Sequence, residues 1–92
     1  MSETEARFYQ GVLSRKRSDS YCKGIVNTIR SFHEAGIDDS VLLSDADIDK
    51  LVCQRHGVKN ISDLFQNCRA KYRRAIRLYR EILLPETQQA VV

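Results

Sequence analysis

The sequence contains no tryptophan, a single proline and only four glycines. So few turn-forming residues favour long helices over a turn-rich sheet. No apolar run is longer than three residues, whereas a transmembrane helix needs about 20. The N-terminal stretch MSETEARF also lacks the basic and then apolar pattern of a signal peptide. We therefore expect a cytoplasmic protein with no membrane contact.

Cysteine is scarce as well. Cys22, Cys53 and Cys68 are odd in number and widely spaced, which is a poor disulfide framework and fits a reducing compartment. The 92 residues leave room for one small domain. We expect a single helical domain over 1–92, ordered over about 3–84, with 85–92 as a frayed tail.

Apolar periodicity predicts an all-α fold, a compact bundle of four to five helices. The first helix covers about residues 3–15. The second is capped by Ser18, Asp19 or Ser20 and ends at Gly36. Its residues Tyr21, Ile25, Ile29 and Phe32 form one apolar stripe.

Two further helices follow. The third opens with a capping box of Ser44 and Asp47 and ends at Gly57. The fourth starts at a cap, Asn60 or Ser62, and reaches about Leu83, shortly before the only proline.

On the fourth helix, charged and apolar residues occupy different faces. At about 100° per residue, with Arg69 at 0°, the apolar residues lie between about 220° and 340° and four arginines between about 0° and 80°. The apolar stripe comprises Phe65, Cys68, Tyr72, Ala75, Ile76, Tyr79, Ile82 and Leu83. The predicted arginine ridge comprises Arg69, Arg73, Arg77 and Arg80. We expect the stripe to be buried and the ridge to remain in solvent.

Such a ridge disfavours an isolated helix, because like charges four residues apart repel. Arginine presents planar donors that suit phosphate and guanine edges, and a helix fits the DNA major groove. The ridge therefore predicts a nucleic-acid partner. A solvated charged face without a partner is the alternative.

Other candidate sites fit the sequence less well. The aspartates of DADID have the alternate spacing of a calcium loop, but Lys50 and His56 stand where that loop needs glycine and glutamate. The spacing of Cys53 and His56 relative to the other cysteines matches no compact zinc module. No catalytic or phosphate-loop motif is present. We expect a binding module with no enzymatic activity, metal or cofactor.

Several segments resemble the N-terminal core-binding domain, also called the SAM-like domain, of tyrosine recombinases and phage integrases. FYQGVL resembles the aromatic first helix of that family, LSDADIDKLV its short acid-capped helix and AIRLYREIL its last helix. Tyr21 and Ile25 stand where the family usually has threonine and tyrosine. The recombinase catalytic domain is absent from this sequence, so the chain is either an excised domain or a small protein that uses the same scaffold.

The resemblance implies that the second and fourth helices face the major groove of double-stranded DNA. We expect mainly phosphate contacts, with the four ridge arginines joined by the outward face of the second helix and the segment before it. These additional residues are Lys16, Arg17, Ser18, Ser20, Lys23, Asn27 and Arg30. A catalytic recombinase domain or another protein is a further expected partner.

A helical protein-interaction domain is the competing interpretation. Small bundles with opposed acidic and basic faces, such as death-fold adaptors, assemble by pairing those faces. The acidic face here would comprise Asp38, Asp39, Asp45, Asp47 and Asp49. A phage-type inhibitor of a nucleic-acid-processing complex is a variant of this interpretation.

Overall fold

The structure is a computed structural model that describes the backbone of residues 2–91 and the side chains of residues 2–84. Over this range it is helical, without strands. Its elements are α1 (Glu3–Leu13), α2 (Asp19–Glu34), α3 (Asp39–Leu42), α4 (Ile48–His56), the 3₁₀ turn η1 (Ile61–Asp63) and α5 (Gln66–Val91). The prediction of an all-α bundle of four to five helices is confirmed.

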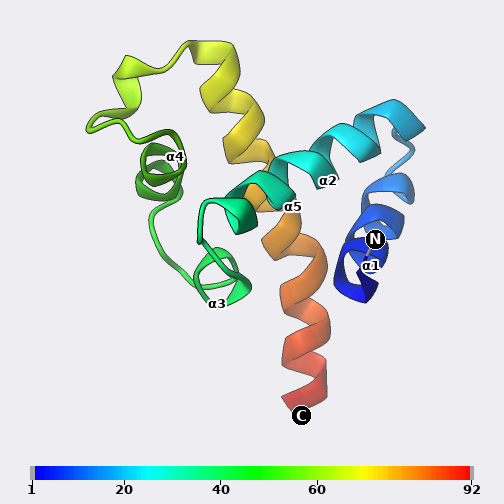
Figure 1. Cartoon of the computed structure of the whole chain (residues 1–92). Coiled ribbons are helices and arrows are strands. Elements are labelled where there is room, and N and C mark those ends of the chain that lie inside the picture. Colours follow the sequence, from blue (N-terminus) through cyan, green and yellow to red (C-terminus); the bar gives the residue numbers. More distant parts are fainter. Residues whose placement is uncertain (1, 92) are drawn as a thin grey trace.

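Helix α5 is the centre of the bundle. Helices α1, α2, α3 and α4 all contact it, with α2 crossing its middle and α1 lying on the opposite side from α3 and α4 (Figure 1). Since every other helix packs on α5, the surface of α5 that stays open is limited to what these neighbours leave uncovered.

Local capping explains where most helices begin and end. The Ser2 hydroxyl accepts a hydrogen bond from the Glu5 amide, and Ser18 does the same for Tyr21, so both helices start at a side-chain cap. Gly57 ends α4 with a left-handed φ of 67°. The predicted capping box on α4 is wrong in detail, because Asp47 itself is the cap and accepts from the Asp49 amide at 2.9 Å.

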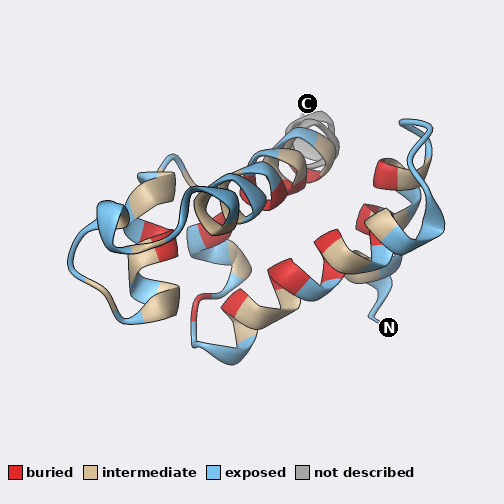
Figure 2. Ribbon diagram, turned by 90° about the horizontal axis from the view of Figure 1, so that it is seen from above, coloured by how far each residue is buried: buried red, intermediate tan, exposed pale blue. Residues whose placement is uncertain are grey.

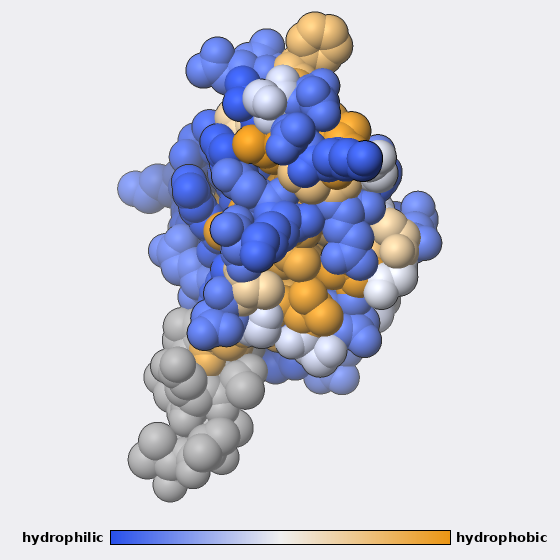
Figure 3. All heavy atoms as spheres, turned by 90° about the vertical axis from the view of Figure 1, so that its left-hand side faces the viewer, coloured by the Kyte–Doolittle hydropathy of each residue, from blue (hydrophilic) through white to orange (hydrophobic). Residues whose placement is uncertain are grey.

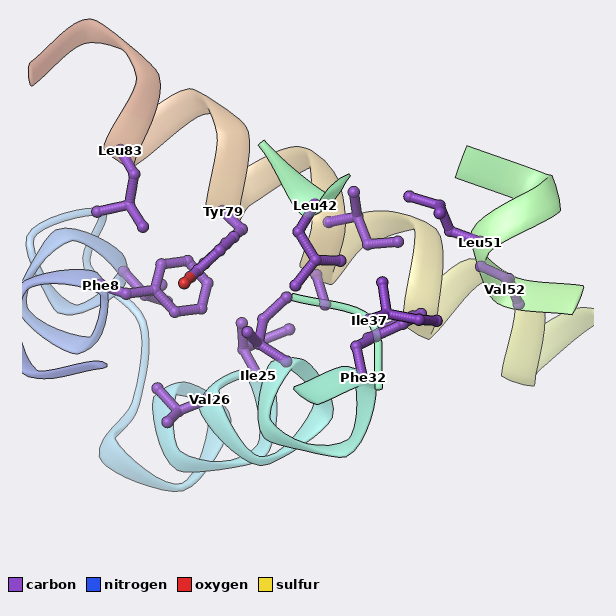
Figure 4. Close-up of a cluster of buried hydrophobic side chains, with 14 of the residues drawn as sticks. Phe8, Ile25, Val26, Phe32, Ile37, Leu42, Leu51, Val52, Tyr79 and Leu83 are labelled. Atoms are coloured by element: carbon purple, nitrogen blue, oxygen red, sulfur yellow. The ribbon is translucent and has the colours of Figure 1, made fainter. Parts of the chain in front are cut away.

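The core joins apolar side chains from all five helices (Figure 4). Buried residues form a stripe along the inner side of α2 and α5, as Figure 2 shows. The fully buried large side chains include Phe8, Phe32, Leu42, Ile76 and Tyr79. The Tyr79 ring packs edge-on against Phe8 with ring centroids 4.8 Å apart. The periodicity of α2 and α5 therefore identified the buried face correctly.

One close approach fixes α1 against α5. A Cβ atom added at Gly11 would lie 2.6 Å from Cγ2 of Ile82, so a larger residue at this position would displace the Ile82 side chain or the helix. The contact also brings the turn between α1 and α2 close to α5, because the Arg15 guanidinium reaches Glu81 at 3.3 Å.

Four details differ from the sequence-based expectation. The last helix does not start at a cap, Asn60 or Ser62, because Ile61–Asp63 form the separate turn η1 and α5 begins at Gln66. Helix α3 was not predicted, because a single turn of four residues carries little periodic signal. Phe65, expected in the apolar stripe, precedes α5 and is 88% exposed. Helix α5 is assigned to Val91, beyond the predicted end near Leu83. The predicted frayed tail, 85–92, lies outside the residues whose side chains are described.

Candidate nucleic-acid interface

Arg73 of the predicted arginine ridge is held by a carboxylate within the chain. Its Nε and Nη2 atoms donate to the two carboxylate oxygens of Asp49 in α4, at 2.6 and 2.9 Å. This hydrogen bonding holds the pKa of Asp49 below its ordinary value. The expectation that Arg73 remains free in solvent is therefore wrong, because Asp49 lies opposite it.

Arg80 is also engaged. Its Nε donates to the Leu42 carbonyl at 2.7 Å and its Nη2 to the Ala46 carbonyl at 2.9 Å. These carbonyls lie at the end of α3 and in the segment before α4, so the guanidinium joins both to α5. The prediction that Arg80 is free for a partner is wrong for the same reason: a neighbouring segment supplies acceptors.

The other two ridge arginines differ from each other. Arg69 is half-buried, and its Nε is shielded from solvent with no hydrogen-bond partner in the described part of the chain. Arg77 is exposed. Both positive charges also favour the ionised form of Asp49 and so lower its pKa further. Only Arg77 of the predicted ridge thus faces solvent as expected.

The outward face of α2, predicted to contact phosphates, is largely paired within the chain. Nε and Nη2 of Arg30 donate to Oε2 of Glu5 at 3.0 and 2.7 Å, and Nη1 donates to Asn27 at 3.2 Å. The Arg30 hydrogen bond lowers the pKa of Glu5. Lys23 forms an ion pair with Asp19 at 3.0 Å. Partner binding through Arg30 would therefore compete with the contact between α1 and α2.

The turn between α1 and α2 is more open. Lys16, Arg17, Ser18 and Ser20 are exposed, and Lys16 has a left-handed φ of 62°. The Arg17 guanidinium lies over the Tyr21 ring, 5.2 Å from its centroid. Ser18 is used as the cap of α2. The two cations of this turn remain accessible to a ligand.

Lys71 and Arg74, which the sequence analysis did not select, lie with Arg77 on the open side of α5. Lys71, Arg74 and Arg77 are exposed, and no hydrogen bond or ion pair engages them within residues 2–84. Lys71 and Arg74 line a groove between α2 and α5 of about 390 Å³, together with Tyr21, Gly24, Ile25, Asn67 and Ala70. We call Arg17, Lys71, Arg74 and Arg77 the basic face.

A second hollow continues this face along α5. It measures about 400 Å³, and Arg74 lines both hollows. The remaining residues of the second hollow are Ala70, Arg73, Arg77, Leu78 and Glu81. Glu81, which lines the second hollow, is paired with Arg15, and Asp19 in the first turn of α2 is paired with Lys23. Among the described residues, no hydrogen bond or ion pair engages the four cations of the basic face, although the charge of Arg77 contributes to the lowered pKa of Asp49.

Helical phase contained a signal for the two α5 arginines of this face, although not for Lys71, which lies about 80° from the middle of the apolar stripe. Arg74 and Arg77 lie about 140° to 160° from the middle of the apolar stripe, whereas Arg69, Arg73 and Arg80 lie only about 80° to 120° from it. Positions near the stripe are the first that neighbouring helices cover. The sequence analysis grouped the arginines by their spacing to one another and not by their distance from the buried face.

The predicted acidic face is partly engaged as well. The Asp39 carboxylate accepts from the Tyr79 hydroxyl and contacts His33 Nε2, both at 2.7 Å. Burial, and next the Asp39 carboxylate, raise the pKa of Tyr79. Asp49 is bound by Arg73. The surface that carries α3 and α4 is mostly hydrophilic, with apolar side chains visible between the polar ones (Figure 3).

Residues 2–84 contain no group of three or more histidine, cysteine, aspartate or glutamate side chains placed to hold a metal ion. His56 Nε2 lies 3.9 Å from Cys68 Sγ, and burial lowers the pKa of this histidine. Within the described part of the chain, no helix combines the length and apolar character needed to cross a bilayer.

No protein-family model matches this sequence, and no curated protein or solved structure shows a significant match to it. The resemblance to recombinase core-binding domains therefore stays a prediction.

Proposed function

We propose that this chain is a non-catalytic DNA-binding module that contacts the phosphate backbone of double-stranded DNA through the basic face. The supporting observation is that Arg17, Lys71, Arg74 and Arg77 are exposed and lack an ion-pair partner among the described residues. Arg73 and Arg80, by contrast, are satisfied within the fold. Phosphate oxygens are the acceptors that such free guanidinium and ammonium groups lack.

The arrangement also suits a rod-like polyanion. The two hollows share Arg74, so cations follow α5 from Lys71 to Arg77, nearly two helical turns, and continue to Arg17 in the turn before α2. Contacts of this kind position a protein on the backbone and read little sequence. A cytoplasmic module of the core-binding type, placed next to a catalytic domain or another protein, is the context that the sequence resemblance implies.

The number of free cations sets the expected salt dependence. Neutralising about four phosphates gives a slope of roughly −3.5 for the logarithm of the binding constant against the logarithm of salt concentration. The full set of cations predicted from the sequence would give a steeper slope. The slope therefore distinguishes the basic face from the predicted arginine ridge.

The direct test is fluorescence anisotropy with a labelled blunt duplex of roughly 20 base pairs, two helical turns, in about 50 mM salt. The double variant Arg74→Glu, Arg77→Glu is compared with Lys50→Glu, Lys59→Glu, whose lysines are exposed and lie outside both hollows. Both variants reduce the formal net charge of +3 by the same amount.

We expect the arginine variant to lose about 30-fold or more in affinity, and the lysine variant less than about fivefold. Equal losses would mean that only bulk charge matters. An absence of binding by the wild type in low salt would refute the proposed function.

A further inference from the structure

The groove between α2 and α5 has a chemical character that phosphate binding alone does not use. Its walls combine the apolar surfaces of Gly24, Ile25 and Ala70 with the ring of Tyr21. The polar lining residues are Asn67, Lys71 and Arg74. Its volume of about 390 Å³ lies within the range of small-molecule sites, about 300 to 1,000 Å³.

Gly24 keeps this groove open. It lies inside α2, where glycine is less favourable than alanine. A Cβ atom built on Gly24 would meet nothing within 4 Å, so no neighbouring atom requires a glycine there. Its carbonyl accepts a hydrogen bond from the Thr28 hydroxyl at 2.8 Å. The absent side chain therefore serves the groove and not the packing of the helix.

Two of the lining residues have unused polar groups. The Tyr21 hydroxyl is shielded from solvent and has no hydrogen-bond partner in the described part of the chain. The Asn67 side chain is exposed, and its amide both donates and accepts. Arg17 lies over the Tyr21 ring, which places a further cation beside the groove. Apolar walls with a few polar groups and cations at the edge match a flat heterocycle attached to phosphates.

We propose that the groove accepts one unpaired nucleobase, so that DNA with an overhang or a bulge binds more tightly than fully paired duplex. This inference rests on the proposed function, because the phosphates beside the base would lie on Arg17, Lys71 and Arg74. The base would pack against the apolar walls, and Asn67 would contact its edge. A stacked base inside a duplex cannot enter the groove, since its faces are covered by its neighbours.

The test compares two labelled probes, a blunt duplex and the same duplex with a 3′ overhang of about four nucleotides. The quantity measured is the ratio of the two Kd values. For the wild type we expect the overhang probe to bind at least about fivefold more tightly, since stacking of one base on an aromatic side chain has this magnitude or more.

Two substitutions of the same glycine provide a matched pair. Gly24→Leu fills the groove, while Gly24→Ala adds a single methyl group, and both favour the helix. We expect Gly24→Leu to reduce the ratio to about one without weakening blunt-duplex binding, and Gly24→Ala to retain most of the preference. Circular dichroism at 222 nm checks that α2 remains helical in both.

The possible failures can be told apart. A wild type that binds blunt duplex through Arg74 and Arg77 but shows no preference for the overhang overturns the inference and leaves the proposed function intact. A preference that persists in Gly24→Leu also overturns it, because the base then binds elsewhere. If the wild type binds neither probe, both proposals fail.

Discussion

The two sides of α5 carry the same kinds of cation and use them differently. On the side facing α3 and α4, Arg73 binds the Asp49 carboxylate and Arg80 binds two backbone carbonyls. On the side facing the α2 groove and solvent, Lys71 and Arg74 have no such acceptor among the described residues. The residue type does not decide whether a cation is structural or available. The decisive factor is what the neighbouring element places opposite it.

The difference has a simple physical origin. A guanidinium group beside the buried stripe of a central helix lies within reach of whatever packs on that helix. Helix α4 presents Asp49 in its first turn, where a negative charge is also favoured by the helix dipole. The end of α3 and the segment before α4 present the carbonyls of Leu42 and Ala46, which are not bonded within a helix. An arginine satisfies both kinds of acceptor with a fixed, planar set of donors.

Among the α5 cations, we expect the largest loss of stability on substitution of Arg80. Arg80→Ala removes two charged hydrogen bonds to backbone carbonyls and should lower the free energy of unfolding by about 2 kcal/mol. Arg77 is an exposed residue of the same helix. Arg77→Ala should therefore lower the free energy of unfolding by less than about 0.5 kcal/mol. Urea unfolding followed by circular dichroism measures both, and equal values would contradict the assigned roles.

Arg73→Ala should have a smaller effect, because its pair with Asp49 is partly screened by solvent, with 32% and 40% of the two side chains exposed. We expect a Tm decrease of about 3 °C at neutral pH. Because the folded-state pKa of Asp49 is depressed, this contribution is present above the unfolded value of about 3.9 and is lost as pH falls further.

Thermal melts across this pH range test whether the stability contributed by the Arg73–Asp49 pair is lost in acid. The difference between wild type and Arg73→Ala should be constant above about pH 5 and should narrow below about pH 4. Arg74→Ala is the control, with little difference from wild type at any of these pH values. A gap for Arg73→Ala that widens in acid would show that Asp49 is not its partner.

The smallest expected effect is a gain in DNA affinity when the acceptor of Arg73 is removed. Asp49→Asn removes the charge that holds Arg73, which already lines the hollow shared by Arg74 and Arg77. Its affinity for the blunt duplex should rise by about threefold in low salt, with a salt slope steeper by up to about one. Asp45→Asn makes the same change in net charge on an exposed residue. Equal gains in affinity for the two variants would show that Arg73 does not bind DNA after its pair with Asp49 is removed.

The sequence predicted the buried faces of the helices well. It predicted poorly which charged side chains form ion pairs within the chain and which remain exposed. Ile25, Ile29 and Phe32 were assigned to the core because their spacing repeats with the helical period, a property of one helix alone. The pairing of Arg73 with Asp49 joins residues 24 positions apart and depends on how α4 packs on α5. The sequence around Asp49 and the sequence around Arg73 do not predict how these two helices pack.

The candidate site shows the same division. Arg17 was selected from the sequence because it belongs to a short basic run, and it lies on the basic face. Lys71 and Arg74 were passed over, although Arg74 lies almost opposite the apolar stripe. The groove itself was not predictable, since it forms where Gly24 of α2 meets Ala70 of α5.

The left-handed backbone of Lys16 shows how the turn between α1 and α2 balances two demands. In this conformation, a residue with a Cβ atom is about 1 kcal/mol less stable than glycine. Replacement by glycine would relax the turn but would remove a positive charge beside Arg17. At this one position, tolerance to heat and attraction to polyanions are opposed, so neither can be improved without loss of the other.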